Sequence, residues 1–153
     1  MRKITPFLWF DHQAEEAANF YVSIFKNSKV GNITRYGDGG PGPKGSVMTV
    51  SFELDGQPFM ALNGGPAFHF TEAISMFVHC ENQQEVDELW GKLLAGGEKS
   101  RCGWLKDKYG LSWQIIPSGL MEALGNKDPE KAKRAMQAML QMDKIDIERI
   151  RNA

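Results

Sequence analysis

The sequence contains the same series of predicted elements twice, and this repeat limits the fold more than any other feature. A short apolar strand, an amphipathic helix and several further strands occur in the first half and again in the second. A shift of 69 positions places Phe7 on Met76 and Tyr21 on Trp90, so the apolar patterns of strand and helix coincide. The repeat predicts two βαβββ modules that form a curved mixed sheet with a concave pocket, and helices outside it. The predicted fold class is therefore α+β.

The first module is predicted to begin with the aromatic segment KITPFLWF at residues 3–10. Pro6 donates no hydrogen bond, so this strand either lies at a sheet edge or starts late. A helix follows from a cap at Asp11 to about Phe25. Further strands are predicted at 29–36, 46–54 and 57–63. The last two form a hairpin, because Asp55-Gly56 is a typical two-residue turn.

The second module is predicted to begin with a strand at 73–80. Asn82 caps a helix over about 83–95, and Gly96-Gly97 ends it. Two or three short strands continue to Pro117. This order reproduces that of the first module.

A helical extension follows the two modules. Asp128-Pro129-Glu130 is a helix-start signal with proline at the first helical position. The predicted apolar stripe of this helix comprises Ala132, Ala135, Met136, Met139 and Leu140. Met136, Met139 and Met142 are expected to be core residues or to cover a partner subunit. The predicted domains are a paired domain over 1–118, with modules of about 1–66 and 73–118, and an extension over 119–153.

Composition excludes several classes of partner. The 153 residues carry a formal net charge of −1 and no basic stripe, which argues against nucleic-acid binding. No apolar run reaches the roughly 18 residues that a membrane span requires. The N-terminus lacks the apolar core of a signal peptide, and Cys80 and Cys102 are too few for a zinc knuckle. A cytoplasmic protein with reduced thiols is expected.

Several blocks of sequence carry a family resemblance. They are PFLWFDHQAEEAANFYVSIFKNSKV, ALNGGPAF, CENQQEVDELWGKLLAGG and CGWLKDKYGLSWQIIP. In this order they resemble the PhnB-like family of the vicinal oxygen chelate superfamily, which includes glyoxalase I, bleomycin-resistance proteins and extradiol dioxygenases. That family often carries the label 3-demethylubiquinone-9 3-methyltransferase. The resemblance implies paired βαβββ modules and a homodimer with shared sites.

The resemblance also implies four metal-ligand positions, which fall on Pro6, Ala61, Ser75 and Gln114. Of these four only Gln114 is a plausible ligand, whereas a catalytic metal needs about three protein ligands. We therefore predict no metal and no cofactor, which argues against glyoxalase and ring-cleaving dioxygenase activity. The methyltransferase label also lacks support, because no glycine-rich turn of the Rossmann type is present.

Strand alternation predicts which residues line the concave face. The predicted lining is Leu8, Phe10, Ala61, Asn63, Ser75, Phe77, His79, Gln114 and Ile116. This mixture of apolar and polar side chains is typical of a small-molecule pocket. Trp104 is a further candidate, since its ring can stack on a flat ligand. The alternative is that these side chains simply fill the hollow.

Two side chains are weak catalytic candidates. His79 is a candidate general base, although a structural role is the simpler interpretation. Cys102 precedes a glycine near the strand ends and is the better thiol candidate, provided that a positive neighbour stabilises its thiolate. Cys80 is predicted to face the helix as a small buried hydrophobe, and Trp113 to pack in the core.

The sequence thus predicts a metal-independent protein that binds a small apolar or aromatic molecule. The first alternative is a metal-free enzyme that uses His79, Ser75, Asn63 and Gln114 for proton transfer, or methyl transfer as the family label implies. The second alternative is a structural or regulatory dimer with a filled core.

Overall fold

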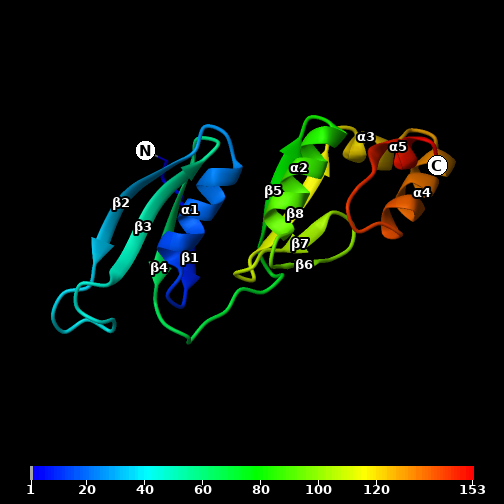
Figure 1. The fold of residues 1–153 in the computed structure, drawn as a ribbon. Helices are drawn as coiled ribbons and strands as arrows, with labels where there is room; N and C mark the ends of the chain where they lie inside the picture. Colours follow the sequence, from blue (N-terminus) through cyan, green and yellow to red (C-terminus); the bar gives the residue numbers. More distant parts are fainter. Residues whose placement is uncertain (1) are drawn as a thin grey trace. The chain divides into compact units, whose positions relative to one another are not determined.

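The computed structural model describes residues 2–153 and divides into two compact units, one ending at Phe70 and the other running from Thr71 to Ala153 (Figure 1). Each unit contains a four-stranded mixed sheet and a helix in βαβββ order, so the predicted pair of modules is confirmed. The first unit contains β1 (Phe7–Phe10), α1 (Ala14–Ile24), β2 (Lys29–Arg35), β3 (Val47–Leu54) and β4 (Gln57–Asn63). The second unit contains β5 (Ser75–Cys80), α2 (Gln83–Leu94), β6 (Glu98–Lys99), β7 (Trp104–Lys106), β8 (Ser112–Pro117), α3 (Leu120–Leu124), α4 (Pro129–Leu140) and α5 (Ile147–Arg151).

In the first unit the strand order is β1-β4-β3-β2. β1 begins at Phe7, directly after Pro6, and lies at the sheet edge, as the missing N–H of proline requires. It pairs parallel to β4, while β3 pairs antiparallel with both its neighbours. The β3–β4 turn consists of Asp55 and Gly56 at φ values of 48° and 76°, which is the left-handed geometry that a two-residue hairpin needs.

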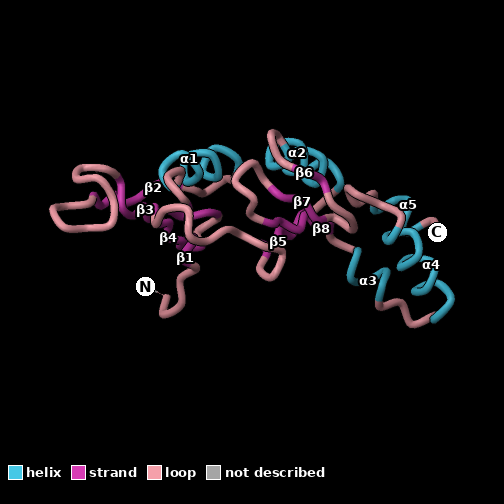
Figure 2. Tube along the Cα trace, turned by 90° about the horizontal axis from the view of Figure 1, so that it is seen from below, coloured by secondary structure: helices cyan, strands magenta, loops and turns pink. Residues whose placement is uncertain are grey.

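One face of this sheet packs against α1 (Figure 2). The buried sheet residues on this face are Leu8, Phe10, Val50, Phe52, Leu54, Phe59 and Ala61. α1 contributes Ala14, Ala17, Ala18 and Tyr21, as its periodicity predicts. The ring centroids of Tyr21 and Phe52 lie 6.3 Å apart. The small alanine side chains let the helix approach the sheet closely, and Tyr21 fills the remaining space.

The start of α1 differs from the prediction. The helix begins at Ala14 rather than after Asp11, and the side chain of Gln13 makes no capping bond. Instead, Asn63 at the end of β4 accepts a hydrogen bond from the Ala14 N–H through Oδ1, at 2.8 Å. Asn63 also donates from Nδ2 to the Val47 carbonyl at 3.1 Å. Its side chain therefore ties the helix start to the sheet.

In the second unit the strand order is β5-β8-β7-β6, with β5 parallel to β8. α2 packs against one face of this sheet (Figure 2). Asn82 accepts from the Glu85 N–H at 2.9 Å, which confirms the predicted cap. The buried helix residues Val86, Leu89, Trp90 and Leu93 face Leu105, Trp113 and Ile115 of the sheet. Trp113 is a core residue, as predicted.

Equivalent positions of the two units are separated by one number of residues in the helices and by another in the strands. The buried positions of α1 recur in α2 at an offset of 72, from Ala14 at Val86 to Tyr21 at Leu93. The residues on the sheet face away from the helix recur at an even offset, such as 70 from Phe7 to Phe77. The single odd offset of 69 is therefore wrong for the strands, because it exchanges the two faces.

The predicted C-terminal extension packs onto the second unit. Its helices bury a core with β8, composed of Ile116, Leu120, Ala135, Met142, Ile145, Ile147 and Ile150. Gly103 has φ +85°, and a Cβ there would lie 3.0 Å from the side chains of Ile116 and Ile145. In the predicted methionine stripe Met142 is buried in this core, whereas Met136 and its neighbour Leu140 of α4 are 41% and 48% exposed respectively.

A single side chain of α2 holds the segment before α5. Gln83 donates from Nε2 to the Ile145 carbonyl at 2.8 Å and accepts from the Ile147 N–H at 3.0 Å. We call this pair of bonds the Gln83 clasp. Lys144 forms an ion pair with Asp87 at 2.8 Å, and its hydrogen bond lowers the pKa of that carboxyl. Along residues 2–153, no helix is long and apolar enough to cross a membrane.

Candidate functional site

The candidate site is the face of the second sheet that points away from α2. We call it the β5–β8–β7 face. Strand pairing places Phe77, Gln114 and Trp104 side by side across three strands. Ser75 and His79 flank Phe77 on β5, with the same alternation. The structure therefore brings together five of the six residues that sequence analysis assigned to this half of the hollow, and the sixth is Ile116.

Gln114 forms a polar centre on this face. Its Nε2 donates to Ser75 Oγ at 2.9 Å, and both side chains are part-buried. In the described chain, the amide Oε1 of Gln114 has no hydrogen-bond partner. Ser112, two residues earlier on the same face, is 1% exposed and its hydroxyl also has no partner. Among the described residues, the Ser112 hydroxyl is the uncommon case of a buried polar group without a partner, whereas the Gln114 oxygen is part-exposed and free to accept a hydrogen bond from solvent or a ligand.

Aromatic rings surround this centre. Phe77 is 44% exposed, although large aromatic side chains usually avoid water. The His79 ring lies 4.7 Å from it, with an angle of 57° between the ring planes. Trp104 is half-buried on the other side of Gln114. A flat molecule with one hydroxyl or amide group therefore matches the face in both shape and polarity.

An ion pair closes one end of the face. Lys106 shares the orientation of Trp104, and its Nζ lies 2.6 Å from Glu72 Oε1. The hydrogen bond between them, with the attraction of the charges, lowers the pKa of Glu72 and raises that of Lys106. Both groups stay charged near neutral pH, so they place a polar edge beside Ser75 and Ser112.

The C-terminal extension closes the opposite end. Ile116 has the same orientation as Gln114 and is the register partner of His79, yet it is only 6% exposed. It belongs to the buried core that β8 shares with the extension. The open part of the face therefore lies between the Lys106 ion pair and Ile116.

The face predicted for the first unit is wrong. Leu8, Phe10 and Ala61 are buried on the side of the sheet that packs against α1. Asn63 has the same orientation, and its amide is used by the helix start and by Val47. These four residues therefore do not line an open sheet face.

The residues that line the opposite face of the first sheet are Phe7, Trp9, Met60 and Leu62. Phe68 lies over Trp9, with ring centroids 4.9 Å apart. Sequence analysis did not identify this face, because FLWF is apolar at every position and shows no alternation of apolar and polar residues. The helix offset of 72, being even, was the signal that identifies the correct face.

The residues of these faces do not fit a glyoxalase-type divalent metal. Ala61 faces α1, and its neighbours Met60 and Leu62 on the open face offer no nitrogen or oxygen donor. In the second sheet, Ser75 and Gln114 are neutral and bonded to each other. In the described residues, no group of three or more His, Cys, Asp or Glu is placed to hold a metal ion. Such a site requires imidazole or carboxylate ligands.

The two thiols lie outside the β5–β8–β7 face. Cys102 has φ +60°, and its Sγ lies 3.7 Å from the Met139 carbonyl oxygen of α4. Its backbone N–H donates to the Met142 carbonyl at 2.9 Å, so this turn attaches the extension. Cys80 is buried and faces α2, as predicted, and burial raises its pKa to about 12. Neither thiol adjoins His79 on the open face.

A cavity of about 400 Å³ lies in the first unit, beside the start of α1. Its wall includes Asp11, Glu15, Tyr36 and the loop at 41–43. The Tyr36 hydroxyl donates to the Asn63 carbonyl at 2.5 Å, so its polar atom is already used. The glycine-rich loop at residues 37–45 leads into β3 rather than into a helix N-terminus, so it lacks the context of a phosphate-binding loop.

Comparison with known proteins identifies the family. The profile of the family described as 3-demethylubiquinone-9 3-methyltransferase matches residues 2–116. The PhnB protein of Bacillus cereus is 41% identical, with a TM-score of 0.71 over 76% of this chain and 100% of that one. Protein PA1353 of Pseudomonas aeruginosa is 20% identical, with a TM-score of 0.63 over 76% and 98%, and shares the fold. No curated protein matches this chain. The chain belongs to the 3-demethylubiquinone-9 3-methyltransferase family and is PhnB-like.

Proposed function

We propose that the protein binds a small aromatic molecule carrying a hydroxyl group on the β5–β8–β7 face, without a bound metal. The observation that carries this proposal is the free amide oxygen of Gln114 between the half-exposed rings of Phe77 and Trp104. The oxygen accepts the ligand hydroxyl, and the rings contact the ligand plane. The hydrogen bond from Gln114 to Ser75 holds the amide in this orientation.

The family description suggests the class of ligand. A demethylubiquinone is a flat ring with a hydroxyl beside a carbonyl, and the β5–β8–β7 face offers an acceptor and stacking surfaces of matching chemistry. We therefore propose a hydroxyquinone or a related phenol as the ligand. The proposal concerns binding, and it does not assign methyl transfer to this chain.

Titration calorimetry with 2-hydroxymethyl-3-methyl-1,4-naphthoquinone, whose hydroxyl stays protonated near neutral pH, tests the proposal, with cyclohexanol as a non-aromatic comparison. We expect saturable 1:1 binding of the quinone and none of cyclohexanol. Phe77→Ala and Gln114→Leu should each weaken binding by about tenfold, from lost stacking and a lost hydrogen bond. Phe68→Ala is the matched control, since Phe68 is also exposed but belongs to the first unit. Equal weakening by Phe68→Ala, or no quinone binding at all, would refute the site.

A second candidate function is metal-free proton transfer on the same face. His79 supports it, because the imidazole lies beside Phe77 and is exposed. Imidazole is the side chain that most readily exchanges a proton near neutral pH. Hydrogen–deuterium exchange of the bound quinone, followed by NMR across pH 5–8, separates the two functions. Enzyme-dependent exchange that His79→Ala abolishes without loss of binding supports catalysis. Binding without exchange supports sequestration, and no stabilisation by any ligand supports a structural dimer.

A further inference from the structure

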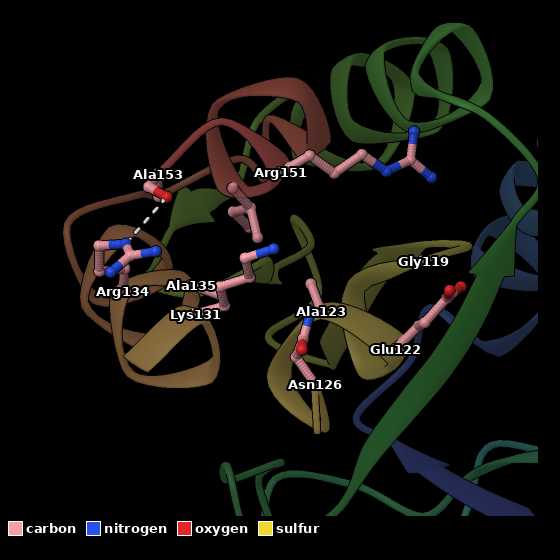
Figure 3. Close-up of a pocket in the computed structure, with 10 residues that line it drawn as sticks. Gly119, Glu122, Ala123, Asn126, Lys131, Arg134, Ala135, Arg151 and Ala153 are labelled. Carbon is pink, nitrogen blue, oxygen red and sulfur yellow. Dashed lines mark hydrogen bonds between the residues drawn. The ribbon is translucent and has the colours of Figure 1, made fainter. Parts of the chain in front are cut away.

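A second cavity lies in the C-terminal extension, away from the β5–β8–β7 face. It has a volume of about 320 Å³ and is enclosed by α3, α4 and the end of α5 (Figure 3). All its lining residues fall between 119 and 153, whereas the family profile ends at residue 116. Nothing in the family match therefore describes this cavity.

The floor of the cavity is apolar and firmly held. Ala135 and Ile150 are 3% and 2% exposed and belong to the core that joins the extension to β8. Ala123 packs against the same core. Ala135 and Ile150 therefore present little surface to the cavity, and the apolar contact that it offers comes mainly from the partly buried Ala123.

The rim of the cavity is mainly basic. Lys131 and Arg134 come from α4 and Arg151 from α5, whereas Glu122 is the one acidic side chain among the lining residues (Figure 3). The Arg134 Nε donates to the Ala153 backbone carbonyl at 3.2 Å, which leaves its two terminal nitrogens available. Lys131 and Arg151 have no ion-pair or side-chain hydrogen-bond partner anywhere in residues 2–153.

Four lysines of the second unit, Lys92, Lys99, Lys106 and Lys144, each form an ion pair with an Asp or Glu, whereas Lys127, Lys131 and Lys133 form none within the described chain. The side chains of Lys131 and Arg151 are therefore available to an external partner. Guanidinium and ammonium groups bind carboxylate and phosphate oxygens through charge-assisted hydrogen bonds.

We propose that this cavity binds a small organic oxyanion, a carboxylate or phosphate monoester that carries a short apolar group. The anionic head lies beside Lys131 and the terminal nitrogens of Arg134, and the apolar group contacts Ala123. The volume is sufficient for a molecule of the size of phenyl phosphate. This site is separate from the proposed quinone site and does not depend on it.

Titration calorimetry of the full chain at low salt tests the proposal with phenyl phosphate, benzoate and inorganic phosphate. We expect 1:1 binding of at least one aromatic anion, and weaker binding of inorganic phosphate because it cannot use the floor. Stronger binding of phenyl phosphate identifies a phosphate monoester site, and stronger binding of benzoate identifies a carboxylate site. Inorganic phosphate binding as tightly as both would overturn the role of the floor.

Three variants locate the site. Lys131→Gln should weaken binding about tenfold, as loss of a charged contact implies. Lys133→Gln is the matched control, because Lys133 lies on the same helix but does not line the cavity, and it should change the affinity less than twofold. Glu122→Gln should strengthen binding by removing the one rim carboxylate.

Equal effects of the two lysine variants, weaker binding by Glu122→Gln, or no saturation in the native chain would overturn the proposal. Unchanged quinone binding by Lys131→Gln separates this site from the first.

Discussion

Cys80 and Cys102 differ in the environment of their thiol groups. Cys80 is 1% exposed at the end of β5, where burial, with a smaller contribution from the Glu85 charge, raises its pKa from 9.0 to about 12. Cys102 is partly exposed in the turn that meets the extension. Since the thiolate is the reactive form, the two thiols should react at very different rates.

We expect iodoacetamide at pH 8 to label Cys102 and leave Cys80 unmodified in the folded protein. A rise of three units in pKa lowers the thiolate fraction at Cys80 by about a thousandfold. The raised pKa also means that burial of the neutral thiol stabilises the fold below pH 9, and that this contribution is lost as pH rises towards 12. Peptide mass spectrometry after timed labelling measures both rates. Labelling of Cys80 in folded Cys102→Ser would contradict the environment described here.

Single residues also show where sequence reasoning succeeds. Asn82, Asp55-Gly56 and Pro129 each act on a backbone within a few residues, so their roles were predicted correctly. The orientation of Gln114 was also predicted correctly, because Trp113 beside it is an obvious core residue. In β1 no residue distinguishes the two faces, and the prediction of Leu8 and Phe10 as lining residues failed for that reason.

At the scale of elements, α1 depends on a residue from another strand. Asn63 lies 49 positions from Ala14 in sequence, yet it supplies the acceptor that a local cap normally provides. No local pattern reveals this role, so the sequence favoured Asp11 as the cap. This bond and the one to the Val47 carbonyl engage the Asn63 amide, although Asn63 also lines the cavity beside α1.

Asn63→Ala should lower the free energy of unfolding by about 2 kcal/mol, since it leaves the Ala14 N–H and the Val47 carbonyl without partners. Gln13→Ala is the matched control, because Gln13 occupies the cap position without making a capping bond, and it should cost less than about 0.5 kcal/mol. Urea denaturation followed by circular dichroism measures both. A larger cost for Gln13→Ala would show that the helix start is capped locally.

At the scale of the whole molecule, α4 exposes apolar side chains that its own unit does not cover. Met136 and Leu140 are 41% and 48% exposed, while Ala135 on the other side of the helix is buried. The methionine stripe was expected to lie in the core or to cover a partner subunit, and the core covers only some of its side chains. We propose that the exposed part contributes to a homodimer interface.

Light scattering should give a mass twice the 17.2 kDa of the chain at micromolar concentration. The double variant Met136→Lys/Leu140→Lys should be monomeric with unchanged circular dichroism, because charges there oppose burial in an interface. Ile74→Lys is the control, since Ile74 is also exposed but lies outside α4, and it should stay dimeric. A native chain that runs as a monomer would refute the dimer, and a dimeric double variant would place the interface elsewhere.

The Gln83 clasp holds the C-terminal segment by its backbone. The family profile ends at residue 116, so the C-terminal segment is an addition to a fold that is complete in its strands without it. One amide on the first turn of α2 engages that segment through backbone groups alone, which any sequence can provide. These two bonds therefore persist whatever side chains stand at 145 and 147, so the backbone of the C-terminal segment stays attached to α2 while the side chains at those positions change.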